Sequence, residues 1–279
     1  MRATQLTMFS LLNPEYYCNM FGDYKDLDDF KEKSGYTIDD VWYPRVTKIV
    51  SINAKPALYR YYGEAASYKA AQDITEQSAK EGTMIHEAVE GLLLGKNPEI
   101  PAKIAPAVRS FSEFFDKNNI QVTPELVERR IVNYDHRYAG TVDAVALIGG
   151  RLGVLDIKTS QAIYRDYSLQ TSAYVDALKN QFRKLETRWI LRIDQIQKCM
   201  RCGATRRVKG GREKVRVDWK NGNGRAAAMR ACEHDWGPLM GEIELKEFPY
   251  WQDDFEAFLG AKKLWEWEND FWLKKAGYL

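Results

Sequence analysis

Residues 138–160 read Y-A-G-T-V-D-A-V-A-L-I-G-G-R-L-G-V-L-D-I-K-T-S, which is two apolar runs joined by Gly149-Gly150. A two-residue Gly-Gly linker suits a type I′ or II′ β-turn, because these turns require positive φ angles. With the two glycines as the turn, the antiparallel register of the hairpin places Asp143 directly opposite Asp156. Directly opposed residues have Cβ atoms about 4.5–5.5 Å apart.

Two aspartates at that spacing repel each other, so the pair predicts a divalent cation between them, since hard cations take carboxylate oxygens as ligands. Lys158 lies two residues beyond Asp156 and therefore on the same face of the strand. The alternative interpretation is a hairpin whose charged ends are simply solvated.

Both faces of this hairpin carry apolar side chains. The expected members are Val142, Ala144, Ala146, Leu155 and Ile157 on one face, and Val145, Leu147, Leu152 and Val154 beside the aspartates on the other. A strand pair buried on both faces is typical of α/β proteins, in which helices cover the two sides of the sheet. The sequence therefore predicts a site at the edge of a buried sheet.

Composition sets broad limits on the class of protein. The 279 residues are 45% hydrophobic and 13% aromatic, and the net charge of +2 is nearly balanced, so only local basic clusters can indicate a nucleic-acid partner. No apolar run approaches the ~20 residues of a membrane span. Residues 1–10 lack the pattern of a secretory signal. We expect a soluble, cytoplasmic protein of a bacterium or a phage-infected cell.

The chain divides into three expected regions. Residues 1–66 form a region of short helices and loops, residues 67–196 and 238–279 form the core, and residues 197–237 form a basic insertion. Within the first region, residues 55–62 mix basic and aromatic side chains. Such a mixture can bind phosphates and stack on bases, or it can be an ordinary helix surface.

A helix expected over residues 67–94 places His86 and Glu90 one turn apart on the same face. A lone histidine beside an apolar stripe is more often a packed core residue, but the neighbouring carboxylate makes His86 a candidate ligand. A helix over about 168–182 likewise pairs Gln170 with Tyr174, and a strand over 126–132 could bring Glu128 near the site. The remaining expected elements are helices at 102–118 and 253–273 and strands at 189–193 and 242–248.

The basic insertion carries two close pairs of soft metal ligands, Cys199-x-x-Cys202 followed by Gly203, and Cys232-x-His234. Two such pairs separated by a loop predict a tetrahedral Cys3His zinc site resembling a zinc-ribbon knuckle. A small loop with few apolar residues needs a metal of this kind to fold. We also expect removal of residues 197–237 to weaken DNA binding more than it harms the core.

Four motifs in order, G-T-M-I-H-E-A-V-E, G-T-V-D, L-D-I-K-T and Q-T-S-A-Y, resemble the RecB-like exonuclease branch of the PD-(D/E)XK nuclease superfamily. This branch includes phage and CRISPR-associated exonucleases and the mitochondrial genome maintenance exonuclease. The resemblance covers roughly residues 43–194 and the terminal strand and helix. It implies a restriction-endonuclease-like fold, with a mixed sheet flanked by helices, and here with an inserted zinc-ribbon-like loop.

The resemblance also implies roles for individual residues. His86, Asp143 and Asp156 would be ligands of Mg²⁺ or Mn²⁺, together with the Ile157 carbonyl. Lys158 would position the attacking water and help to deprotonate it. The remaining motif residues, with supporting roles, are Gln170, Tyr174 and Glu90.

Some relatives carry a [4Fe-4S] cluster on four cysteines, one before the nuclease motifs and three after. Cys18 and the three later cysteines match that count, but Cys232 lies far beyond Cys202, and His234 offers a better fourth ligand. The spacing therefore favours zinc, with an iron–sulfur cluster as the alternative.

The expected function is a metal-dependent DNA exonuclease that hydrolyses phosphodiester bonds in recombination, repair or phage DNA metabolism. Its partner would be DNA that is single-stranded or has free ends. One alternative is a catalytically silent DNA-binding adaptor, against which the complete set of Asp143, Asp156 and Lys158 argues. The other is a nuclease for CRISPR spacer acquisition.

Overall fold

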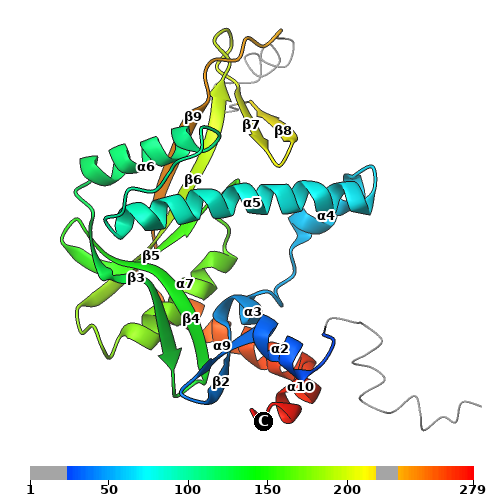
Figure 1. Ribbon diagram of the computed structural model, residues 1–279, viewed down its shortest axis with the longest axis vertical. Coiled ribbons are helices and arrows are strands. Elements are labelled where there is room, and N and C mark those ends of the chain that lie inside the picture. The colour runs from blue at the N-terminus through cyan, green and yellow to red at the C-terminus, as the bar shows by residue number, and fades with distance from the viewer. Residues whose placement is uncertain (1–23, 218–231) are drawn as a thin grey trace, which may run out of the picture.

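A mixed β-sheet lies at the centre of the protein in the computed structural model, which describes residues 24–217 and 232–279 (Figure 1). Neighbouring strands follow the order β3-β4-β5-β6, and β9 pairs with β6. The β5–β6 pair is parallel and is connected by helix α7 (Asp166–Leu178), whereas the other three pairs are antiparallel. The strands are β3 (Gln121–Asn133), β4 (Tyr138–Ile148), β5 (Arg151–Lys158), β6 (Leu185–Lys198) and β9 (Met240–Glu247).

The β4–β5 hairpin has the predicted turn. Gly149 and Gly150 have φ angles of +58° and +81°, and a type I′ turn needs positive φ at both central residues. The predicted register is confirmed from Ile148–Arg151 to Ala144–Leu155, where the pairing of β4 with β5 ends. Asp143 and Asp156 therefore lie just beyond the last paired residues.

Helices cover both faces of the sheet, as Figure 1 shows, which confirms the predicted α/β class. On one face, α5 (Tyr68–Leu93) and α6 (Ala105–Lys117) pack against Ala144, Leu155 and Ile157 in one apolar cluster. On the other face, α7, α3 (Val46–Val50) and α9 (Gln252–Glu268) form a second cluster with Val145 and Val154. The sheet is thus buried on both sides, as the apolar residues on both faces of the hairpin predicted.

The predicted alternation of β4 is wrong at one residue. Val142 was expected on the same face as Ala144, but it packs in the cluster of α7 and α9, whereas Ala144 packs in that of α5 and α6. The regular alternation of a strand is therefore interrupted between these two residues. Asp143 lies at this irregularity.

The N-terminal region contains a two-stranded sheet in addition to the expected short helices. Its elements are α2 (Leu27–Ser34), β1 (Gly35–Ile38), β2 (Val41–Pro44), α3 and α4 (Pro56–Glu64). Phe30 is fully buried, and its ring lies 5.4, 6.4 and 5.8 Å from those of Trp42, Trp265 and Trp272. This aromatic cluster fixes the N-terminal elements to the C-terminal helices.

The single helix predicted over residues 253–273 is instead two helices, α9 and α10 (Asp270–Lys275). Asn269 separates them, with φ −107° and ψ 19°. Its side-chain amide donates a hydrogen bond to the Trp265 carbonyl at 2.8 Å. Asparagine side chains compete in this way with the backbone hydrogen bonds of a helix, which explains the break.

The described part of the basic insertion is a hairpin of β7 (Thr205–Lys209) and β8 (Arg212–Arg216), which continues the central sheet because β7 pairs with the end of β6. Its turn lies on α5, where the Gly210 amide donates to Glu81 Oε1 at 3.1 Å. A deletion of residues 197–237 would therefore also remove contacts of the core. Of the basic residues of the insertion, Lys220, Arg225 and Arg230 lie outside the described residues.

Among the described helices, none combines the length and the apolar composition that crossing a membrane requires.

Candidate active site

Three potential metal ligands from three different elements meet at the middle of β3 and β4, next to the point where the pairing of β4 with β5 ends. His86 Nε2 of α5 lies 3.3 Å from Asp143 Oδ2 of β4, and His86 Nδ1 lies 3.9 Å from Glu128 Oε1 of β3. One ligand atom from each residue lies within 4.8 Å of the other two. His86 and Asp143 were both candidates from the sequence, and the structure brings them together with Glu128.

The backbone of β3 explains the position of Glu128. The β3–β4 register pairs Val127 with Ala144 and Arg129 with Val142, so Glu128 lies across from Asp143. The register of β3 shifts between Val122 and Val127, and Glu128 has a φ of +48°. A positive φ is uncommon for a residue other than glycine and costs about 1–3 kcal/mol, and such strain is often found at functional sites. No sequence pattern announces this irregularity.

Asp143 is held by the backbone of the neighbouring strand. Its Oδ2 accepts a hydrogen bond from the Ile157 amide at 2.6 Å. The resemblance assigns the Ile157 carbonyl to a metal, and that role remains a prediction. The observed contact shows that Ile157 also positions a carboxylate through its N–H group.

Asp156 forms a separate arrangement with Lys158 and Gln170. Its side chain is fully buried, and its Oδ1 accepts hydrogen bonds from Lys158 Nζ at 2.9 Å and Gln170 Nε2 at 3.1 Å. Its Oδ2 lies 2.8 Å from Lys158 Nζ, but the direction does not suit a hydrogen bond. The group of close ligand atoms contains Glu128 and not Asp156, but the charge of Asp143 helps to raise the pKa of Asp156 and Lys158 interacts with both carboxylates. A cation shared by Asp143 and Asp156 remains a prediction.

Gln170 and Tyr174 lie as predicted on one face of α7. Gln170 Nε2 also lies 2.9 Å from the Tyr174 hydroxyl, and both side chains are buried. This contact orients the amide that reaches Asp156. Glu90, the other motif residue, lies one turn beyond His86 on α5, and its charge helps to raise the pKa of Glu128.

The charges of the site shift several pKa values. Burial raises the pKa of Glu128 to about 7, and the charge of Asp143 adds to this effect. Burial also raises the pKa of Asp156 to about 6, although Lys158 opposes the increase. In both residues burial disfavours the charged carboxylate first and the charge of Asp143 adds to it, and a divalent cation would stabilise the charged forms.

Neighbouring charges also shift the pKa values of the other groups of the site. The hydrogen bond to Asp143 raises the pKa of His86. Burial disfavours the charged form of Asp143, but His86 and Lys158 outweigh it and lower the pKa of this carboxyl. Burial also opposes the charge of Lys158, but Asp156 and Asp143 together raise its pKa. Lys158 is therefore a cation at neutral pH.

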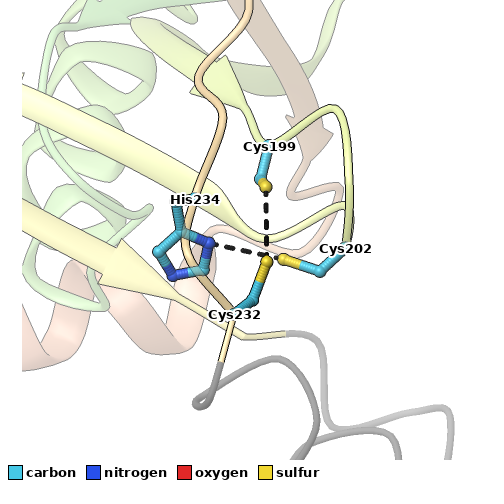
Figure 2. Close-up of side chains that lie close together, drawn as sticks. All are labelled: Cys199, Cys202, Cys232 and His234. Carbon is cyan, nitrogen blue, oxygen red and sulfur yellow. Dashed lines mark hydrogen bonds between the residues drawn. The ribbon is translucent and has the colours of Figure 1, made fainter.

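A second candidate metal site lies beyond the end of β6, where the structure brings Cys199, Cys202, Cys232 and His234 together as predicted (Figure 2). Cys199 Sγ lies 4.0 Å from Cys232 Sγ, and Cys202 Sγ lies 3.4 Å from His234 Nδ1. Figure 2 shows the four side chains pointing toward a common centre. The group could bind a metal.

The spacing of these atoms suits a single tetrahedral ion. With metal–sulfur distances of about 2.3 Å, tetrahedral geometry separates two sulfur ligands by about 3.8 Å. Burial disfavours the Cys199 thiolate, but hydrogen bonds from the Cys202 backbone and His234 lower its pKa to about 5. A thiolate is the form that binds metals. Cys18, the fourth cysteine of the iron–sulfur alternative, lies outside the described residues.

Comparison with known proteins identifies no family. No family model matches the chain, and no curated protein matches it. A solved structure described as the crystal structure of SSO0001 is similar over 60% of this chain and 69% of its own. The sequence identity is 19% and the TM-score is 0.28, and a similarity this low carries no argument about function.

Proposed function

We propose that this protein is a metal-dependent deoxyribonuclease, an exonuclease that hydrolyses phosphodiester bonds of DNA. The observation that carries the proposal is the convergence of His86, Glu128 and Asp143 beside the buried pair of Asp156 and Lys158. These residues come from α5 and from three adjacent strands. A cluster of carboxylates with one lysine at a sheet edge is suited to phosphodiester hydrolysis.

The donor set fits a hard divalent cation such as Mg²⁺ or Mn²⁺. Two carboxylates and an imidazole provide oxygen and nitrogen ligands, and Asp156 Oδ2 is a buried oxygen without a hydrogen bond. Magnesium retains several waters, so a few protein ligands suffice. A bound cation would neutralise charge on the phosphate and lower the pKa of a coordinated water.

Lys158 would act on the substrate through its charge, and two residues of α7 would hold its partner Asp156 in position. The Lys158 ammonium, held by Asp156, would stabilise negative charge that develops on the phosphate oxygens. Its raised pKa supports this electrostatic role in the free protein over proton acceptance. Gln170 and Tyr174 would hold Asp156 in place, because their hydrogen bonds connect it to α7.

The finer parts of the proposal depend on the resemblance. The histidine motif on α5 favours exonuclease action on free ends over internal cleavage. A role in recombination, repair or phage DNA metabolism follows from the same family branch. The Cys3His group would hold a structural zinc ion in a zinc-ribbon-like insertion, with [4Fe-4S] as the alternative.

The test is degradation of end-labelled single- and double-stranded linear DNA with Mg²⁺, Mn²⁺ or EDTA. Asp156→Ala and Lys158→Ala should abolish metal-dependent cleavage while retaining DNA binding. Asp116→Ala and Lys117→Ala change the same residue types at exposed positions near the end of α6 and should cleave normally. Binding without cleavage by the wild type in either metal would overturn the proposal and favour the DNA-binding adaptor.

A further inference from the structure

A basic pocket lies between α5 and the β7–β8 hairpin, away from the candidate active site. Its volume is about 170 Å³, enough for several waters at about 30 Å³ each or for one phosphate group. Its lining includes Tyr61, Ser78, Arg207, Lys209, Arg212 and Lys214. The pocket thus joins the basic and aromatic segment of residues 55–62 to the basic insertion, which is distant in the sequence.

Positive charge in this pocket exceeds the nearby negative charge. Arg207 pairs with Asp194, and Lys209 donates to the Thr159 carbonyl. Within the described part of the chain, Arg212 and Lys214 form no ion pair, and Lys214 Nζ lies 2.7 Å from the neutral side-chain amide of Gln161, whose oxygen accepts from it when the amide is turned toward it.

The nearby carboxylates do not neutralise this excess of positive charge, because they already pair with other cations. Asp194 also lies close to Arg192, and Glu81 pairs with Lys103. Burial lowers the pKa of Lys214, and Arg216, Arg212 and Arg207 lower it further, with only Glu64 opposing them. Burial and Arg207 together lower the pKa of Lys209 to about 8. Positive charges gathered around one pocket favour an anion as its ligand.

An aromatic surface adjoins the cations. The Arg212 guanidinium lies 4.4 Å from the centre of the Tyr61 ring, a cation–π contact that holds it at the pocket. The Tyr61 hydroxyl donates to the Ala71 carbonyl at 3.2 Å, which fixes α4 against α5. The neighbouring Tyr62 packs against Tyr61, with ring centres 5.5 Å apart, so the aromatic surface continues along α4. Cations interleaved with aromatic rings suit the backbone and bases of a single strand.

The pocket and the active site share one helix. Ser78 of α5 lines the pocket and His86 of the same helix belongs to the active site, and at 1.5 Å per residue this separates them by about 12 Å along the helix. Between them, a Cβ atom at Gly82 would lie 2.5 Å from Thr159 Oγ1. This glycine thus allows the segment after Lys158 to lie directly against α5, where Lys209 contacts it.

We propose that this pocket binds a backbone phosphate of the DNA strand, a few nucleotides from the phosphodiester that is cleaved. Arg212 and Lys214 contact the phosphate, and Tyr61 acts as a positioning residue for Arg212. The proposal rests on the proposed nuclease function for its substrate, but the binding that it describes does not depend on cleavage.

The first experiment measures binding of fluorescein-labelled single-stranded dT20 in EDTA over a range of salt concentrations. Arg212→Gln/Lys214→Gln should weaken binding about tenfold and reduce the salt slope by about 0.7, the contribution of one neutralised phosphate of a single strand. The matched control is Arg183→Gln/Lys184→Gln, two exposed residues next to the other end of β6. Equal binding by the two double variants would overturn the proposal.

The second experiment distinguishes substrate binding at the pocket from the cleavage step at the active site. The kcat for thymidine 5′-p-nitrophenyl phosphate, which is too short to reach both sites, should be unchanged in the pocket variant, whereas KM for dT20 should rise about tenfold. Loss of activity on both substrates would contradict a remote phosphate site. If the wild type cleaves neither substrate, the nuclease function fails while the binding experiment still decides the pocket.

Two further measurements sharpen the assignment. Tyr61→Leu should weaken dT20 binding, and Tyr61→Phe, which retains the ring under Arg212, should restore it. Equal effects of the two substitutions would count against a positioning role. Saturable binding of inorganic phosphate as tight as that of dT20 would reassign the pocket to a free anion and overturn the proposal.

Discussion

His86 Nε2 lies 3.3 Å from Asp143 Oδ2, although one residue belongs to helix α5 and the other to strand β4. The contact connects the helical layer to the sheet at the point where β4 and β5 separate. It leaves Asp156 to pair with Lys158 on the next strand. The candidate site therefore consists of two adjacent groups of side chains.

Gln170 connects α7 to Asp156 and should orient this carboxylate without itself binding the metal. Gln170→Ala removes the hydrogen bond to Asp156 Oδ1 and the contact with Tyr174. We expect the Mn²⁺ concentration for half-maximal cleavage to rise about 10- to 100-fold, the usual effect of losing a residue that orients a ligand. The exposed Gln181→Ala is the control, and equal metal titration curves for the two variants would refute the role.

The Cys3His group should contain one zinc ion per chain. Cys202→Ser removes a sulfur next to His234 and should lower zinc content by elemental analysis to well below half an equivalent. Cys18→Ser is a discriminating control, because it should retain zinc in our interpretation but lose an iron–sulfur cluster in the alternative. Stoichiometric labile sulfide in anaerobically purified protein would contradict the zinc assignment.

The ion pair of Arg188 and Asp254 should matter for stability more than a surface pair. The Arg188 side chain is fully buried, while Asp254 is 24% exposed. Asp254→Ala leaves the guanidinium buried without its carboxylate and should lower the free energy of unfolding by about 3 kcal/mol in urea denaturation. Arg188→Met/Asp254→Ala should recover at least half of the loss, and a double variant as unstable as Asp254→Ala would exclude this cause.

Lys209 should make stability depend on pH in the alkaline range. Its pKa is about 8 in the folded protein, because of burial and Arg207, against 10.5 for an ordinary lysine. Below pH 8 Lys209 is protonated in both the folded and the unfolded protein, so the buried charge lowers the free energy of unfolding by its full amount. As pH rises from 8 toward 10.5 the folded state releases the proton first, so stability increases by about 3 kcal/mol.

The measurement compares wild type with Lys209→Met by urea denaturation at pH 7.0, 8.5 and 10.0. The free energy of unfolding of the wild type should rise relative to that of the variant across this range. A constant difference between the two proteins would show that the lysine does not titrate with a lowered pKa. The comparison cancels the titration of all other groups that the two proteins share.

The sequence by itself determined the local elements of the fold. Gly149-Gly150 specified the turn and register of the central hairpin, because few residues tolerate positive φ at both positions. Apolar residues on both faces predicted a covered sheet, and helical spacing placed Gln170 beside Tyr174. Ligand spacing likewise predicted the Cys3His group, since each pair of ligands is local in the chain.

The tertiary structure alone decided which carboxylates meet. Glu128 reaches His86 through a register shift and a positive φ in β3, neither of which has a signature in residue type. The pairing of β4 with β5 ends at Ala144 and Leu155, just before the two aspartates, and the Ile157 amide donates to Asp143 Oδ2. The basic pocket also depends on contacts between α4, α5 and the β7–β8 hairpin, which are distant in the chain. Periodicity describes one element at a time, whereas a site between elements depends on how they pack.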